Sequence, residues 1–407
     1  MTTTLRAAKE SYAHGYLSAR DSRTAFSHVL ILGILLLLLA SNLSMFPPVG
    51  TSKAAGSSLS QQIPALARLA PQCTNCVLRN ITVGSGPDFL LYDPLDGNIF
   101  VPNTGSSNVT IINGTSNKVV ANSVVNPDDG SAAVDTANGD VYVTSGTSNY
   151  IAILNGSTGA VIGNVSVGNG TGGIGFDPIS RLLFVTTNVS VASIGVIVNT
   201  TTNKVVGSFQ GGIQSWGVLY NPFNHYIYVS ATQSPTAAVP GNVTILNGST
   251  GKSVASVTTG LSSNDMAVDP VNGNVYVANP NGNDVTVIDG SNFTVLATLA
   301  AGTYPRAATY DPITREVYVG NLQSPYVTVI DPSVNKVVGS IPTGTSYSVQ
   351  GIATDTTTGL LYASNILSNT VTVIQATNLN LPAITSFAPS NASFDKGLGV
   401  YLNVSVV

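Results

Sequence analysis

The sequence predicts an all-β fold, and three observations lead to that prediction. A segment is present in seven copies at intervals of 42 to 48 residues, each copy except the last holds four short runs of alternating β-branched or aromatic residues, and turn residues separate the runs. Four antiparallel strands at such a period are typical of one blade of a β-propeller. We therefore expect a seven-bladed β-propeller with four-stranded blades.

The repeat is clearest around the turn between the first two strands of each copy. L-L-Y-D-P-L-D-G-N-I-F-V-P-N (90–103) returns as M-A-V-D-P-V-N-G-N-V-Y-V-A-N (266–279) and as A-T-Y-D-P-I-T-R-E-V-Y-V-G-N (308–321), with weaker copies between and after them. One turn position carries an acidic or amide side chain in every copy: Asp93, Asp135, Asp177, Asn221, Asp269, Asp311 and Asp355. Because Asp and Asn cap turns, we interpret these side chains as structural rather than as a carboxylate cluster or calcium site.

The fifth copy illustrates the expected blade. Its four strands are predicted over 265–269, 274–278, 284–289 and 294–299. The third and fourth strands of several copies are joined by Asn-Gly or Asp-Gly, which suits a tight hairpin turn: these pairs stand at 113–114, 155–156, 247–248 and 289–290.

The two ends of the repeat region predict how the ring closes. The last copy has runs at 350–354, 360–364 and 370–374 but lacks a fourth strand, whereas V-L-R-N-I-T-V-G (77–84) precedes the first copy and resembles a fourth strand. We expect strand 77–84 to complete the last blade, which gives a propeller domain over 77–378. Closure of this kind removes the exposed sheet edges that invite aggregation.

A known family shares these motifs. F-V-P-N, Y-V-A-N and Y-V-G-N, each after D-P-x-x-G or D-P-x-x-R, resemble the YVTN-type β-propeller repeat of archaeal surface-layer proteins and secreted bacterial proteins, over residues 77–376. The resemblance implies the fold and leaves the function open, since related propellers range from structural surface proteins to quinoprotein-like and lyase-type enzymes. Residues 382–407 resemble the opening strands of an Ig-like or PKD-type domain and form only a part of one.

The N-terminal region predicts export from the cytoplasm. Residues 1–28 form a basic tail, residues 29–46 are an uncharged apolar run, and residues 47–72 are a linker rich in Pro, Gly, Ser and Ala. The apolar run is either an uncleaved transmembrane anchor or the core of a cleaved signal peptide. Both alternatives place the rest of the chain at the cell surface or outside the cell, with the membrane as a partner of 29–46 if it is an anchor.

Composition excludes some classes of function. Charged residues make up only 8% of the chain and the net charge is −4, so a nucleic-acid-binding role is not expected. Sequons for N-glycosylation are frequent, and four of them fall at predicted turns between the third and fourth strands: Asn113, Asn155, Asn199 and Asn247. Sugars at these turns would hydrate a surface that has few charges, although Asn in such turns also has a purely structural explanation.

Few residues of the exported part could support catalysis. Cys73 and Cys76 form a C-x-x-C without partner ligands for zinc, and we expect a local disulfide. Beyond the linker the chain has one histidine, His225, and one glutamate, Glu316, and both are expected in turns between the first two strands of a blade. We therefore expect no catalytic residue, no metal and no cofactor.

One face of the predicted ring gathers candidate ligand-binding residues. The loops before the first strand and between the second and third strands meet there, and they carry Asp88, Trp216, Asp265, Tyr304, Arg306, Tyr347 and Gln350. The alternative is that these side chains plug the channel or pack between blades. The sequence predicts a non-catalytic cell-surface protein that serves envelope structure, adhesion or the binding of glycans, peptides or other envelope proteins. The alternatives are a quinoprotein-like or lyase-type enzyme and a scaffold or sensor for another envelope protein.

Overall fold

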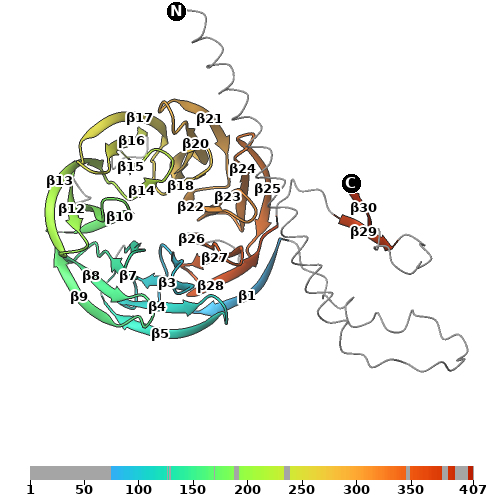
Figure 1. Ribbon diagram of the computed structural model, residues 1–407, viewed down its shortest axis with the longest axis horizontal. Coiled ribbons are helices and arrows are strands. Elements are labelled where there is room, and N and C mark those ends of the chain that lie inside the picture. The colour runs from blue at the N-terminus through green and yellow to red at the C-terminus, as the bar shows by residue number, and fades with distance from the viewer. Residues whose placement is uncertain are drawn as a thin grey trace, which may run out of the picture. The chain divides into compact units, whose positions relative to one another are not determined.

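The computed structural model describes residues 75–377 except 126, 128–129, 169, 188–191, 233–238 and 345–348, and the backbone of residues 384–389 and 402–406. Seven four-stranded sheets stand in a ring around a central axis (Figure 1). The predicted seven-bladed β-propeller is confirmed. The basic tail, the apolar run 29–46 and the linker lie outside the described residues. Within the described part, no helix combines the length and the apolar character needed to cross a membrane.

Each of the first six blades is built from four strands that follow one another in the sequence. Blades 1 and 2 contain β2 (Leu91–Asp93), β3 (Asn98–Asn103), β4 (Asn108–Asn113), β5 (Lys118–Val124), β6 (Ala132–Asp135), β7 (Asp140–Val143), β8 (Tyr150–Asn155) and β9 (Val161–Ser166). Blades 3 and 4 contain β10 (Thr171–Asp177), β11 (Leu182–Thr187), β12 (Ala192–Asn199), β13 (Lys204–Ile213), β14 (Val218–Asn221), β15 (Tyr226–Ala231), β16 (Pro240–Asn247) and β17 (Ser253–Leu261). Blades 5 and 6 contain β18 (Met266–Val268), β19 (Val275–Asn279), β20 (Asp284–Ile288), β21 (Val295–Ala300), β22 (Pro305–Asp311), β23 (Glu316–Asn321), β24 (Tyr326–Asp331) and β25 (Lys336–Pro342), with the short 3₁₀-helix η2 (Pro280–Gly282) after β19.

The seventh blade is assembled from both ends of the propeller. It contains β26 (Val349–Asp355), β27 (Leu360–Asn365) and β28 (Thr370–Gln375), and its outer strand is β1 (Cys76–Thr82). The antiparallel pairing of β1 with β28 runs from Cys76 opposite Gln375 to Thr82 opposite Thr370. The predicted closure by the N-terminal strand is confirmed, with the strand beginning one residue earlier and ending two residues earlier than 77–84.

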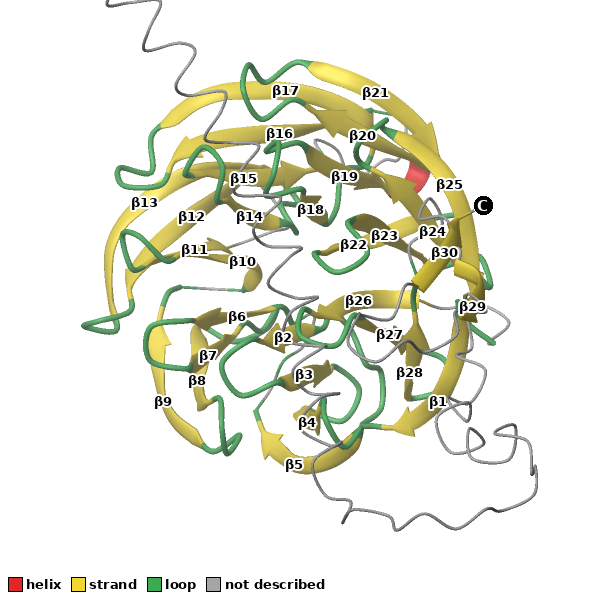
Figure 2. Ribbon diagram, turned by 45° about the vertical axis from the view of Figure 1, so that its right-hand side comes forward, coloured by secondary structure: helices red, strands yellow, loops and turns green. Residues whose placement is uncertain are grey.

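The ring has two faces that differ in their connections (Figure 2). On one, which we name the turn face, lie the short turns that join the first strand of each blade to the second and the third to the fourth. On the other, the loop face, lie the connections between blades and those between second and third strands. Because β28 ends and β1 begins on the turn face, the chain enters and leaves the propeller there.

Buried aromatic side chains of the second strands join neighbouring blades. The hydroxyl groups of Tyr142, Tyr276 and Tyr362 donate hydrogen bonds of 2.6–2.7 Å to Asn side chains in the turn between the outer strands of the next blade, at Asn203, Asn335 and Asn117. All three asparagines have positive φ, between 51° and 53°, which Asn and Gly tolerate better than other residues. Blades 1 and 3 carry Phe100 and Phe184 at the same place and pack without this hydrogen bond.

The seven repeated Asp or Asn side chains act as turn caps, as the sequence predicts. Each is nearly or fully buried, and its Oδ1 accepts a hydrogen bond from the backbone N–H two residues later, as Asp93 does from Leu95 at 2.9 Å. The last residue of the Y-V-x-N motif is structural as well. Asn103, Asn279, Asn321 and Asn365 are buried, and each donates through Nδ2 to a threonine hydroxyl on the third strand of the blade.

Two local features extend or correct the sequence analysis. Glu316 is not a surface turn residue: it is the first residue of β23, only 1% exposed, and its Oε2 accepts a hydrogen bond of 2.9 Å from the Tyr318 hydroxyl. In the predicted partial Ig-like segment 382–407, β29 (Ile384–Pro389) pairs antiparallel with β30 (Leu402–Val406).

Candidate ligand-binding cavity

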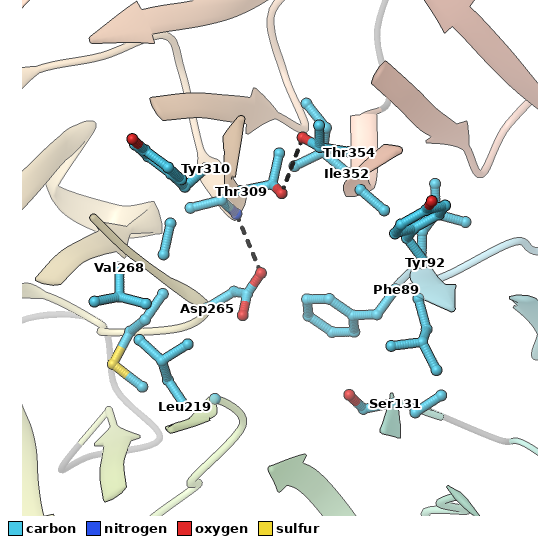
Figure 3. Close-up of a pocket in the computed structure, with 18 of the residues that line it drawn as sticks. Phe89, Tyr92, Ser131, Leu219, Asp265, Val268, Thr309, Tyr310, Ile352 and Thr354 are labelled. Atoms are coloured by element: carbon cyan, nitrogen blue, oxygen red, sulfur yellow. Dashed lines mark hydrogen bonds between the residues drawn. The ribbon is translucent and has the colours of Figure 1, made fainter. Parts of the chain in front are cut away.

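A cavity of about 570 Å³ occupies the axis of the ring. The innermost strands of all seven blades, or the residues just before them, contribute to its wall. A volume of this size matches the pockets that hold small organic ligands. Figure 3 shows the part of the wall discussed below.

The wall combines apolar side chains with polar groups. Leu219, Val268 and Ile352 provide aliphatic surface, and Phe89 projects its ring into the cavity from blade 1 (Figure 3). Two hydroxyl groups of the wall are hydrogen-bonded to each other, since Thr309 Oγ1 and Thr354 Oγ1 are 3.2 Å apart. A wall that combines apolar surface with polar groups is typical of a site that buries the body of a ligand and fixes its orientation by a small number of polar contacts.

Asp265 is the charged residue that lines the cavity. It lies directly before β18, and its Oδ2 accepts a hydrogen bond of 3.1 Å from the backbone N–H of Ala308 in the next blade. Burial raises the pKa of Asp265 to about 6, while hydrogen bonds from the Ala308 and Met266 N–H groups and the charge of Arg306 oppose the rise. No ion-pair partner within 4 Å is found for Asp265 among the described residues.

A second polar group stands beside the cavity, where blades 6, 7 and 1 meet. Asp88 is 2% exposed, and its Oδ1 accepts a hydrogen bond of 2.9 Å from Gln350 Nε2 and lies 3.9 Å from Arg306 Nη2. The Arg306 guanidinium carbon lies 5.5 Å from the centre of the Phe89 ring, within the range of a cation–π interaction. The Asp88 backbone oxygen also accepts a hydrogen bond of 2.7 Å from the Ser364 hydroxyl, so this group ties the ring closure together.

The structure separates the residues that the sequence proposed for ligand binding. Trp216 and Asp265 line the cavity. Asp88, Arg306 and Gln350 form the network beside it and make contacts between blades, which is the alternative that the sequence analysis left open. Tyr304 has a positive φ of 58°, and its N–H donates to Asn283 Oδ1 in a loop away from the cavity wall. Tyr347 lies outside the described residues.

Sequence reasoning missed Phe89, although a signal for it exists in the repeat. The position four residues before the turn cap is occupied by Phe89, Ser131, Gly173, Gly217, Asp265, Ala307 and Gly351. Glycine is required in several blades, because a Cβ at Gly173 would lie 2.2 Å from the Trp216 carbonyl oxygen and one at Gly351 would lie 2.6 Å from that of Asp88. Phe89 and Asp265 are the two large side chains at this position, and both face the cavity (Figure 3).

The other predicted site residues lie away from the cavity. Cys76 is disulfide-bonded, and Cys73, the other cysteine of the chain, lies outside the described residues. Asn113, Asn155, Asn199 and Asn247 end the third strands of blades 1 to 4 on the turn face, and each Oδ1 accepts a hydrogen bond from the backbone N–H three residues later. His225 is also on the turn face, with Nδ1 2.8 Å from the Tyr220 hydroxyl. The described residues contain no group of three or more His, Cys, Asp or Glu placed to hold a metal ion.

Comparison with known proteins adds support for the fold. No protein-family model matches the sequence, and no curated protein matches it. Among solved structures, Kuenenia stuttgartiensis hydrazine synthase is similar, with a TM-score of 0.63 and 19% sequence identity over 73% of this chain and 97% of that chain. At this identity the similarity concerns the fold alone.

Proposed function

We propose that this chain is a non-catalytic cell-surface propeller of the YVTN type that binds a small organic ligand in its axial cavity. The observation that carries the proposal is the cavity itself, which is about 570 Å³ in volume and combines an apolar wall with one carboxylate. Ligands of this kind are held by burial of their apolar surface, and the polar groups select among them.

Two features of the turn face support a surface role. The chain enters and leaves the propeller on this face, where β1 begins and β28 ends. Five large apolar side chains are 45–74% exposed at turns of the same face: Leu95, Ile179, Phe223, Val271 and Ile313. An apolar surface of this kind suits proximity to a membrane or to another envelope component.

The chemistry of the cavity favours binding over catalysis. Its described ionisable lining residues are Asp265, Tyr92 and Tyr310, and Asp265 lacks an adjacent base or acid with which it could form a proton-transfer pair. An enzyme of the quinoprotein or lyase type remains the second candidate from the family resemblance. Demonstration of turnover, in place of simple binding, would favour that candidate.

Isolation of the bound ligand tests the proposal. The full-length protein would be purified from its native cells, and the small molecules released on denaturation would be compared by mass spectrometry with those from a Ser131→Trp variant. Ser131 lines the cavity and its side chain points inward (Figure 3), so an indole there would occupy the ligand volume. Val271→Trp is the matched control, because it adds the same indole to an exposed turn.

The proposal predicts a compound that is present with the parent protein and with Val271→Trp and is depleted with Ser131→Trp. If the folded Ser131→Trp variant carries the same compounds in the same amounts, the cavity is not the binding site.

The glycosylation hypothesis is tested on the same material: intact glycopeptides at Asn113, Asn155, Asn199 and Asn247 would support it, and bare side chains in a host that glycosylates other exported proteins would contradict it.

A further inference from the structure

We infer that the ligand of the cavity is an organic cation, a protonated amine on an apolar body, and that Asp265 binds its ammonium group. The inference rests on the proposed function, because it names the ligand class of the same cavity. Four features of the described residues carry it: the uncompensated carboxylate, the charge of the loop face, the ring that faces the carboxylate, and the contacts that already hold the nearby cation.

The Asp265 carboxylate is held in place but is not neutralised. The backbone N–H groups of Ala308 and Met266 donate hydrogen bonds to the carboxylate, and the bond from Ala308 holds Oδ2 on the side of blade 6. The two ion pairs found among the described residues join Arg181 to Asp135 and Arg306 to Asp88, so neither of them includes Asp265. Asp265 is half-buried, so its carboxylate is partly withdrawn from water without a paired cation, and an ammonium group that enters the cavity supplies that partner.

The loop face as a whole is negative. Its described charged side chains are Asp88, Asp265, Asp284 and Arg306, which sum to a formal charge of −2 when the carboxyls are ionised. A field of this sign attracts cations to the cavity and repels anions.

The wall opposite Asp265 suits the body of an amine ligand. The ring of Phe89 points toward the Asp265 carboxylate from the far side of the cavity, and Leu219 and Ile352 complete an apolar surface around the space between them (Figure 3). An ammonium group beside an aromatic ring also gains from the negative face of the ring. Recognition thus requires one charged head and an apolar body, rather than a series of hydrogen bonds along the ligand.

Arg306 is the nearest competing feature, since its guanidinium could attract an anion. It is placed by Asp88 at 3.9 Å and by the Phe89 ring at 5.5 Å, so its charge is already opposed and one side of its plane is occupied. The positive charge of Arg306 on β22 and the negative charge of Asp88 before β2 therefore nearly cancel. The charge of Asp265, directly before β18, determines the sign of the charge that the ligand must carry.

Three probes with the same phenyl body and different heads test the inference. Binding of 2-phenylethylammonium, 2-phenylethanol and 3-phenylpropanoate to the full-length protein in detergent would be measured by calorimetry at pH 7.5. We expect the ammonium compound to bind about tenfold or more tightly than the alcohol, as a charge-assisted hydrogen bond in a partly desolvated site implies. We expect the carboxylate compound to bind more weakly than the alcohol.

Two variants test whether Asp265 causes the preference for the ammonium compound. Asp265→Asn retains an oxygen that can accept from Ala308 N–H but removes the charge, so the preference for the ammonium compound should disappear while the alcohol still binds. Asp284→Asn is the matched control, because Asp284 is a half-buried loop-face carboxylate that does not line the cavity. It removes the same charge from the same face and should leave the preference unchanged to within about twofold.

A pH series on the parent protein gives a second measurement that needs no variant. Asp265 has a pKa of about 6, and the charged group that acts on it from a neighbouring element is Arg306, which is itself paired with Asp88. The ammonium compound should therefore lose about tenfold in affinity for each pH unit below 6, and the alcohol should not.

The outcomes separate the inference from the proposed function. Equal affinity for the ammonium and alcohol compounds, tighter binding of the carboxylate compound, or a preference that survives in Asp265→Asn would overturn the inference and leave a ligand-binding cavity in place. If none of the three compounds binds, the cavity does not accept small organic molecules of this size, and both the proposed function and the inference fail.

Discussion

The hydrogen bond between Tyr362 and Asn117 allows a sharp test of how the ring is held closed. Tyr362 belongs to the last blade and Asn117 to the first, and the hydroxyl lies 2.7 Å from Asn117 Oδ1 and 3.2 Å from the Gly114 carbonyl oxygen. The Tyr362 side chain is fully buried, so Tyr362→Phe leaves both acceptors without this donor. We expect the free energy of unfolding to fall by about 1–2 kcal/mol, which lowers the melting temperature by about 2–4 °C for a domain of this size.

A double-mutant cycle assigns that loss to the hydrogen bond. Asn117→Gly removes the acceptor and keeps the backbone unstrained, because φ at this position is 53° and glycine adopts that value freely. In the Asn117→Gly background, Tyr362→Phe should cost less than half as much as in the parent protein, with the remainder due to the Gly114 carbonyl. Tyr150→Phe is the control, since among the described residues no hydrogen bond of the Tyr150 hydroxyl is found. Equal costs of Tyr362→Phe in the two backgrounds would refute the reasoning.

Three further predictions concern closure, pH and compartment. Deletion of 72–84 removes β1, so the melting temperature should fall by more than 10 °C and the exposed β28 edge should promote association; unchanged melting of a monomer would contradict the closure. Asp265 binds its proton more tightly in the folded chain, with a pKa of about 6, than in the unfolded one, so its contribution to stability is present below pH 4 and is lost as pH rises through 6. Asp265→Asn should abolish this part of the pH dependence, up to about 3 kcal/mol, and an unchanged difference in stability between pH 4 and pH 7.5 would show that Asp265 is not its source. A reporter that is active only outside the cytoplasm should work when it is fused after residue 72, and activity only inside would contradict the surface location.

The fold could be predicted closely because each blade repeats the same local signals. In the fifth copy the expected strands 265–269, 274–278, 284–289 and 294–299 correspond to β18, β19, β20 and β21 within two residues at each boundary. The turn caps, the alternation of apolar residues and the missing last strand are all local patterns, and the closed ring is the arrangement that satisfies them together. Residues 382–407 lack these patterns, so for them the sequence showed only a resemblance to the opening strands of an Ig-like or PKD-type domain.

The site could be predicted only in part, because the sequence places a residue on a loop but does not show in which direction its side chain points. Trp216 and Asp265 line the cavity as proposed, whereas Asp88 and Gln350 are buried in contacts between blades that no spacing reveals. Phe89 was not among the predicted residues, although it stands out at a repeat position where other blades have glycine, as at Gly173, Gly217 and Gly351. Glu316 was expected in a turn, but it is the first residue of β23, where its buried carboxylate accepts a hydrogen bond from the Tyr318 hydroxyl.

The fluorescence of Trp216 tests the central claim most directly, namely that the axial cavity binds a small organic ligand. Trp216 is the only tryptophan of the chain and lines the cavity, so its emission reports on the cavity alone. Titration of the full-length protein with a library of small amines, alcohols and carboxylates should shift the emission saturably for a subset of compounds, with a preference for amines. No saturable shift with any compound, while the protein remains folded by circular dichroism, would contradict the account.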